Sequence, residues 1–316
     1  LFKAAWPAVQ DGAILTHSIA DAPLLTSREP FPVLLFSPGL CVPSLAYSAQ
    51  LDNLASHGYV IFALEPTHAV TGVIFPDGRI IPCDQTLPPT QPYSAEQLRL
   101  GRNENDSWAA DVRFMLDRIV ALNKDVRDRF SHKLDLSRIG AFGHSSGGRT
   151  AVRVCQTDAR VRACVNEDGQ WYWIPYYPDD GSSSLNQPFM MLDHRDPELP
   201  DAAYAAMHIT REAYAARRAA RIAIGKTMYE AVHGGSYQVT ITTPDVDHGS
   251  FCDVRILQAV GDATKAAHYT EVLAFTRKYT LSFFDKYLRG ATGTALDSPT
   301  QPNANVIVQR FGAANR

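Results

Sequence analysis

Residues 138–150, RIGAFGHSSGGRT, constrain this chain more than any other stretch. They read as an apolar strand, a sharp GHSSG turn and the start of a helix. In a G-x-S-x-G turn, glycines on both sides of the serine keep side chains out of the crowded strand–helix junction, and the serine hydroxyl projects toward a base. The segment therefore predicts a nucleophile elbow, with Ser145 as the nucleophile.

The same residues also resemble a phosphate-binding loop. Residues 143–150 spell G-x-x-x-x-G-R-T, one residue away from that motif. The loop needs a lysine to reach the phosphates, and Arg149 stands at that position. Nucleotide binding is therefore the weaker of the two interpretations.

Composition limits the remaining classes of protein. The chain has 316 residues, of which 45% are apolar and 20% charged, as expected of one large α/β domain spanning 1–316. Its net charge of −3 argues against a nucleic-acid partner. It has no run of about 18 apolar residues, so we expect no membrane span. Oligomeric state is left open.

Apolar strands alternate with helical patterns along the chain. A short continuous apolar run indicates a strand buried on both faces, and apolar residues three and four apart indicate an amphipathic helix. This alternation predicts a doubly wound, mostly parallel sheet with flanking helices. The expected strands are 33–36, 59–64, 138–142, 161–165, 188–192 and 237–242, with a surface strand or arm after Gly290. The expected helices are 45–57, 107–123, the elbow helix to residue 157, 201–232 and 263–288.

Three segments depart from this alternation. Residues 1–30 are irregular and could hold one or two short edge strands. Residues 65–100 are rich in proline and glycine and predict a long loop excursion, with a hairpin tip at 75–79. The Ala-rich helix expected at 201–233 should break near Gly225. Its arginines predict a solvated face, although a helix placed there could also serve as a lid or cap.

The five cysteines form no C-x-x-C pair, so a zinc site is not expected. Cys155 and Cys164 fall in apolar helix and strand contexts, which predicts free buried thiols. One disulfide involving Cys41, Cys83 or Cys252 stays open.

The start of the chain and one short motif bear on the compartment. The chain opens LFKAAWPA, without an initiator Met or a signal peptide, and we expect a processed or truncated start. Asn105-Asp106-Ser107 is a glycosylation sequon, and Ser107 also suits a helix N-cap. Together these features favour secretion.

An activated serine needs a base, and the base needs an orienting carboxylate. With this kind of elbow the chain order is serine, acid, histidine. His248 follows the last long strand of the predicted sheet and is the candidate base. Asp168 ends the strand after the elbow helix and Asp196 follows the next strand, with Asp193 as a weaker third. The residues alone do not separate these acids.

Backbone groups should complete the site. An oxyanion hole would combine the Ser146 N–H with an N–H from the turn after strand 33–36, where Leu40 is the candidate. The aromatic run 171–178, WYWIPYYP, begins with Trp171, Tyr172 and Trp173. It could be an anchored surface loop or an apolar wall for the substrate, because ligands of open α/β sheets bind beyond the strand ends.

The chain resembles the platelet-activating factor acetylhydrolase family, isoform II-like, and related bacterial and fungal esterases. The segments that carry the resemblance are FPVLLFSPGL, ASHGYVIFALE, RIGAFGHSSGGRTA, CVNEDGQ, DHGSFCD and YTLSFFDKYLRG. The family's acid maps to Asp168 and its base to His248. Asp196 sits where related polyester hydrolases and cutinase-like enzymes carry their acid, so it stays the alternative. The family's S-H-G-L-G turn reads S-P-G-L-C here, and the Leu40 N–H survives the change.

The resemblance implies an α/β-hydrolase fold and a serine carboxylesterase without cofactor or metal. It also implies short acyl chains, on a phospholipid or another ester with an apolar body. Two alternatives remain, a polyester or cutinase-like hydrolase that uses Asp196 and a non-catalytic binding protein with the same fold.

Overall fold

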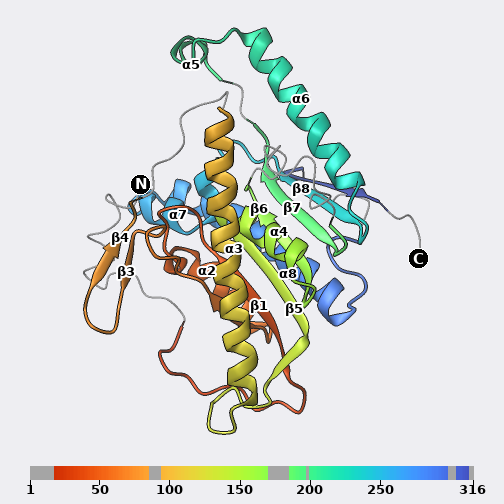
Figure 1. Cartoon of the computed structure of the whole chain (residues 1–316). Helices are drawn as coiled ribbons and strands as arrows, with labels where there is room; N and C mark the ends of the chain where they lie inside the picture. The colour runs from red at the N-terminus through yellow and green to blue at the C-terminus, as the bar shows by residue number, and fades with distance from the viewer. Residues whose placement is uncertain (1–17, 85–93, 170–184, 197–198, 298–303, 313–316) are drawn as a thin grey trace.

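The computed structural model describes residues 18–84, 94–169, 185–196, 199–297 and 304–312 (Figure 1). The strands are β1 (Phe31–Ser37), β2 (Val60–Ala63), β3 (Gly72–Ile74), β4 (Ile80–Pro82), β5 (Leu134–His144), β6 (Val161–Glu167), β7 (Phe189–His194), β8 (Ser236–Ile241) and β9 (Val306–Phe311). The helices are η1 (Ser44–Tyr47), α2 (Ser48–Ser56), α3 (Ala95–Lys124), α4 (Ser146–Thr157), α5 (Asp201–Ala206), α6 (Arg211–Glu230), η3 (His248–Phe251), α7 (Val254–Gln258) and α8 (Ala263–Arg289).

Seven strands of the described chain form the main sheet, in the order β2-β1-β5-β6-β7-β8-β9. Neighbouring strands are parallel from β2 to β8, and only β9 runs antiparallel, against β8. Parallel neighbours bring the carboxyl ends of β1, β5, β6, β7 and β8 to one edge of the sheet. In open α/β sheets that edge is where ligands bind.

Helices cover both faces of the sheet, as Figure 1 shows. Alternating residues of each strand enter opposite layers of the core. In β1, Leu34 and Phe36 pack with side chains of α2 and α8, while Val33 and Leu35 pack with side chains of α3 and α4. The apolar runs in the sequence exist because the central strands are buried on both faces. The predicted doubly wound fold is confirmed.

The first strands differ from the prediction in two respects. Segment 59–64 was expected to be buried on both faces, but β2 is an edge strand of the described sheet and its side chains are partly exposed, since it pairs only with β1. No strand occurs in the described part of 1–30, residues 18–30.

The proline-rich stretch contains the predicted hairpin. β3 and β4 pair antiparallel around 75–79, where the Phe75 N–H donates to the Arg79 carbonyl. The excursion is shorter than expected, because α3 begins at Ala95 rather than Ser107. Ser94 and Gln97 form a capping box at its start, a signal present in the sequence as S-x-x-Q.

The sequon lies inside α3. The Asn105 side chain is 7% exposed, and its Oδ1 accepts a hydrogen bond from Thr150 on α4. Because Asn105 is buried within a helix, the folded chain does not present this sequon on its surface.

The predicted helix 201–232 breaks elsewhere than at Gly225. α5 ends at Ala206 and α6 begins at Arg211, with the Thr210 side chain accepting from the Ala213 N–H as N-cap. Gly225 lies buried within α6. Tyr204 on α5 is buried, and its ring packs against that of Tyr214 on α6.

The cysteine prediction was partly wrong. Cys155 on α4 and Cys164 on β6 form a disulfide, because α4 packs directly on β6 and brings the two Cα atoms within 6.4 Å. Cys41 and Cys83 form a second disulfide, which ties the turn after β1 to the end of the β3–β4 hairpin. Cys252 is free and buried. No described helix has the length and apolar character needed to cross a membrane.

Candidate active site

The elbow lies at the junction of β5 and α4. Ser145 follows the last residue of β5 and has φ 56° and ψ −121°, a backbone conformation that is strained for a residue with a Cβ. Its N–H donates to the carbonyl of Glu167, 2.9 Å away on β6. The strained geometry lifts the side chain out of the strand–helix junction, as a nucleophile elbow requires.

The glycines around Ser145 allow the turn after β1 to press against the elbow. A Cβ at Gly143 would lie 2.3 Å from the Ser37 carbonyl oxygen, and one at Gly147 would lie 1.9 Å from the same atom. Both separations are far below van der Waals contact. The glycines therefore set how closely the turn that carries Leu40 can approach Ser145.

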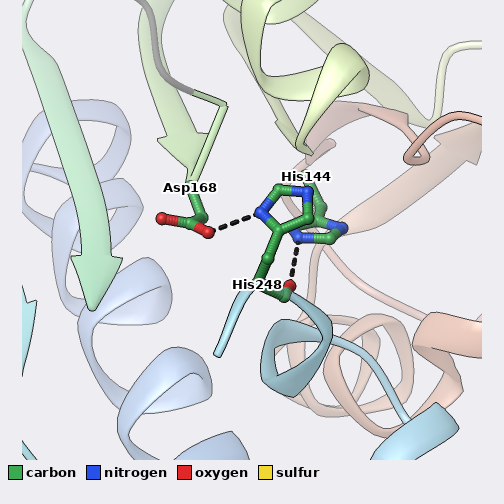
Figure 2. Close-up of side chains that lie close together, drawn as sticks. All are labelled: His144, Asp168 and His248. Atoms are coloured by element: carbon green, nitrogen blue, oxygen red, sulfur yellow. Dashed lines mark hydrogen bonds and ion pairs between the residues drawn. The ribbon is translucent and has the colours of Figure 1, made fainter. Parts of the chain in front are cut away.

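Ser145, His248 and Asp168 form a hydrogen-bonded series. His248 Nε2 lies 2.8 Å from Ser145 Oγ, and His248 Nδ1 lies 2.5 Å from Asp168 Oδ2. Figure 2 shows His248 pointing toward Asp168. In the neutral ring Nδ1–H donates to the carboxylate, so Nε2 is left to accept the serine proton. These contacts join residues that lie 103 and 80 positions apart in the sequence.

Local structure holds His248 in place. It opens η3, just beyond β8, and the preceding Asp247 caps that short helix through the Gly249 N–H. Arg255 pairs with the Asp247 carboxylate. The cap fixes the backbone at His248, so the imidazole is held at the carboxyl edge of the sheet.

The Asp168 carboxylate forms hydrogen bonds with two histidines, His194 and His248. Its backbone has φ 52°, and its N–H donates to the Leu192 carbonyl at 2.8 Å. Its Oδ1 lies 3.2 Å from His194 Nδ1, while Oδ2 serves His248. Burial alone would raise the pKa of Asp168, but hydrogen bonds from His194 and His248 outweigh it and hold this pKa well below its usual value. The carboxyl is therefore ionised at neutral pH.

The other two candidate acids face elsewhere. Asp196 forms ion pairs with Arg218, at 3.3 Å, and with Arg221. Asp193 is buried and accepts hydrogen bonds from Gln238 and Thr240, each at 2.7 Å. Of the three carboxylates, the structure brings only Asp168 to His248.

The same ion pairs correct the prediction for α6. The arginines of this helix were expected to form a solvated face. Arg218 and Arg221 instead pair with Asp196, whereas Arg211 and its partner Asp201 are both exposed, in agreement with the prediction. Charge spacing along the helix could not show this, because the carboxylate of Asp196 comes from the segment after β7.

The backbone donors proposed for the oxyanion hole lie beside the serine. A Cβ at Gly39 would be 3.4 Å from the Ser145 Cβ, which places the Gly39–Leu40 turn directly against the nucleophile. Ser146 is the first residue of α4, where backbone N–H groups have no partner within the helix. Both donors therefore lie at the edge of the sheet that carries Ser145.

Sequence reasoning missed three residues of this network, His144, Tyr47 and His194. His144 is buried between the elbow and η3, and its Nε2 lies 2.9 Å from the His248 carbonyl oxygen (Figure 2). Its Nδ1 lies 2.8 Å from the Tyr47 hydroxyl. Burial lowers the pKa of His144 to about 3, so the ring is neutral.

The predicted apolar wall, Trp171, Tyr172 and Trp173, lies outside the described residues.

His144, Asp168 and His248 place potential metal-ligand atoms within 4.8 Å of one another. His144 uses both ring nitrogens in hydrogen bonds with protein groups, and Asp168 pairs with two imidazoles. The cluster is therefore a connected hydrogen-bond network.

A mostly parallel sheet with a strained serine after β5 and a histidine after β8 defines the α/β-hydrolase fold. The family model for platelet-activating factor acetylhydrolase, isoform II, matches residues 8–73. The chain is thus similar to that family and to carboxylic ester hydrolases, and the resemblance read from the sequence is confirmed.

Individual relatives give the extent of the similarity. Platelet-activating factor acetylhydrolases from Bos taurus and Cavia porcellus are 27% and 25% identical, over 60% and 58% of this chain. A probable 1-alkyl-2-acetylglycerophosphocholine esterase from Arthroderma benhamiae is 26% identical over 50% of it. The matches span 45%, 44% and 36% of these three relatives, so the chain covers less than half their length.

One solved structure supports the fold over almost the whole chain. A ferulic acid esterase from Streptomyces cinnamoneus superposes with a TM-score of 0.65 at 25% identity. The superposition covers 93% of this chain and 77% of that one.

Proposed function

We propose that this chain is a serine carboxylesterase in which Ser145 is the nucleophile, His248 the base and Asp168 the orienting acid. The observation that carries the proposal is the hydrogen-bonded series from Ser145 Oγ through His248 to Asp168. The strained backbone of Ser145 and the similarity to named esterases support it.

The geometry suits acyl transfer. Ser145 Oγ attacks the ester carbonyl while His248 Nε2 takes its proton, and the carboxylate of Asp168 stabilises the imidazolium. The N–H groups of Leu40 and Ser146 bind the oxyanion of the tetrahedral intermediate. Collapse of that intermediate expels the alcohol, which receives the proton from His248. A water activated by His248 then hydrolyses the acyl-enzyme.

The names of the relatives support a proposal for the substrate class. These relatives are named as platelet-activating factor acetylhydrolases and as a probable 1-alkyl-2-acetylglycerophosphocholine esterase, so we propose esters with short acyl chains. The solved relative is named for ferulic acid, an aromatic acyl group. A panel of p-nitrophenyl esters of increasing acyl length, run beside a feruloyl ester and an acetylated phospholipid, would identify the preferred acyl group.

A Ser145→Ala variant tests the reaction itself. We expect wild type to react covalently with an organophosphate and to hydrolyse p-nitrophenyl acetate. Ser145→Ala should not be labelled, and its kcat should fall on the order of 10⁴-fold or more. Ser137→Ala is the matched control, because Ser137 lies exposed on the same strand and should keep full labelling. A wild type that takes no label would favour a non-catalytic binding protein.

A further inference from the structure

A buried pair of side chains joins the two halves of the site. The Gly39 N–H donates to the Tyr47 hydroxyl at 3.0 Å, and that hydroxyl lies 2.8 Å from His144 Nδ1. His144 Nε2 lies 2.9 Å from the carbonyl oxygen of His248. The series runs from the turn that carries Leu40 to the backbone of the histidine that contacts Ser145.

The two ends of this series fix the direction of every hydrogen bond. A carbonyl oxygen can only accept, so His144 carries its proton on Nε2 and donates it to His248. Nδ1 of the neutral ring then accepts the Tyr47 proton, and the Tyr47 oxygen accepts from the Gly39 N–H. Each donor and acceptor has one partner.

Burial makes the series stiff. The side chains of Tyr47 and His144 are 0% and 3% exposed. The Tyr47 ring packs against Phe36, with centroids 4.9 Å apart, and the His144 ring packs against Phe251 at 5.9 Å. A Cβ at Gly39 would lie 3.1 Å from both His144 Nδ1 and the Tyr47 hydroxyl, so the turn rests directly on this pair. A buried polar network loses much of its stabilisation when one member is removed.

We propose that Tyr47 and His144 are positioning residues of the esterase. They set the oxyanion turn and the His248 backbone at a fixed separation across Ser145. Neither side chain takes a proton in the reaction or touches the ester. The inference rests on the proposed function, because it assigns these residues to the oxyanion hole and the base of that reaction.

A change at Tyr47 or His144 should weaken binding of the transition state more than binding of the substrate. The oxyanion forms only after attack, so a displaced turn weakens binding of the tetrahedral species and leaves the ground state almost unchanged. Loss of a direct oxyanion donor costs on the order of 10²–10³ in rate, and a displaced donor should cost less.

Tyr47→Phe is the direct test, with Tyr237→Phe as the matched control. Tyr237 lies in the same core layer but near the start of β8, at the opposite edge of the sheet. On p-nitrophenyl acetate we expect Tyr47→Phe to lower kcat about 10- to 100-fold with KM within about threefold. Affinity for a trifluoromethyl ketone, which forms a tetrahedral oxyanion adduct, should fall by the same factor as kcat/KM. Tyr237→Phe should keep both values.

His144 provides the second variant, should Tyr47→Phe fold poorly. His144→Gln keeps an N–H that can reach the His248 carbonyl, whereas His144→Leu does not. We expect Gln to recover part of the kcat that Leu loses, about fivefold or more for one hydrogen bond. A merely structural role would lower the melting temperature of both variants and leave kcat and ketone affinity of the folded proteins unchanged.

The outcomes separate the two proposals. A wild type without organophosphate labelling or turnover overturns the proposed function and this inference with it. An active wild type whose kcat and ketone affinity are unchanged in Tyr47→Phe and in His144→Leu overturns the inference alone.

Discussion

Glu167 and Asp168 stand next to each other at the end of β6, and both carboxyl groups are buried. Burial acts on the two in the same direction, yet their pKa values move apart. The pKa of Glu167 is raised to about 7 by desolvation, against the hydrogen bonds from Gln50 and Thr280. The pKa of Asp168 is held well below its usual value by two histidines.

The difference lies in the partners and the side of the sheet that supplies them. Glu167 points into the layer of α2 and α8, where its neighbours are the neutral side chains of Gln50 and Thr280. Asp168 follows the strand and faces the imidazoles at the sheet edge. At Glu167 the two neutral donors do not offset the cost of burying a charge, whereas at Asp168 the hydrogen bonds and positive charge of the two imidazoles do. One position in the sequence therefore separates a structural acid from a candidate catalytic one.

Asp168→Asn should give the largest effect. The amide cannot stabilise an imidazolium and favours the wrong ring tautomer of His248, so kcat should fall about 10³- to 10⁴-fold. Asp196→Asn is the matched control, since Asp196 pairs with Arg218 and Arg221. Its kcat should stay within about threefold of wild type, because it breaks only partly exposed ion pairs. A larger loss in Asp196→Asn than in Asp168→Asn would reverse the assignment of the acid.

His194 should give an intermediate effect. His194→Leu removes the second donor to Asp168, leaving a buried carboxylate that is less satisfied, and we expect kcat to fall about tenfold. His194→Asn keeps an N–H near the position of Nδ1 and should recover most of that loss. Steady-state kinetics across pH would measure both variants. Equal activity in the Leu variant and wild type would show that Asp168 needs only His248.

Glu167→Gln should leave the chemistry nearly intact and change stability instead. An unfolded glutamate titrates near pH 4.3, and the folded carboxyl keeps its proton up to about pH 7. Between these values the unfolded chain binds fewer protons than the folded one, so the free energy of unfolding of wild type falls as pH rises. The contribution is at most roughly 1.4 kcal/mol per pH unit.

The Gln variant lacks this titration. Urea unfolding of both proteins at several pH values between about 4.5 and 7 measures it, since other groups cancel in the difference. The stability of wild type relative to the variant should decline across this window. Parallel curves would mean that Glu167 is already ionised in the folded chain.

The elements that the sequence predicted well share a local cause. Continuous apolar runs identified the central strands because those strands are covered on both faces, and the glycine spacing around Ser145 identified the elbow. The start of α3 was missed although its capping box is visible in the sequence at Ser94 and Gln97.

What the sequence did not show depends on contacts between distant segments. Tyr47 and His144 lie 97 residues apart, and each reads alone as an ordinary core residue. Cys155 and Cys164 are close in sequence, but their pairing depends on how α4 packs against β6. The carboxylates Asp168 and Asp196 both follow buried strands, and they differ only in the folded chain, where Asp168 contacts His248 and Asp196 pairs with arginines of α6.

The disulfide between Cys41 and Cys83 has a practical consequence. Cys41 directly follows Leu40, so this covalent tie belongs to the turn proposed to hold the oxyanion. Disulfides persist in oxidising compartments, whereas a bacterial cytoplasm keeps the cysteines as thiols. The route of recombinant production therefore decides how firmly that turn is anchored. The oxidised chain carries one free thiol, on Cys252, out of five cysteines. A thiol titration of the denatured protein would show which form each preparation contains.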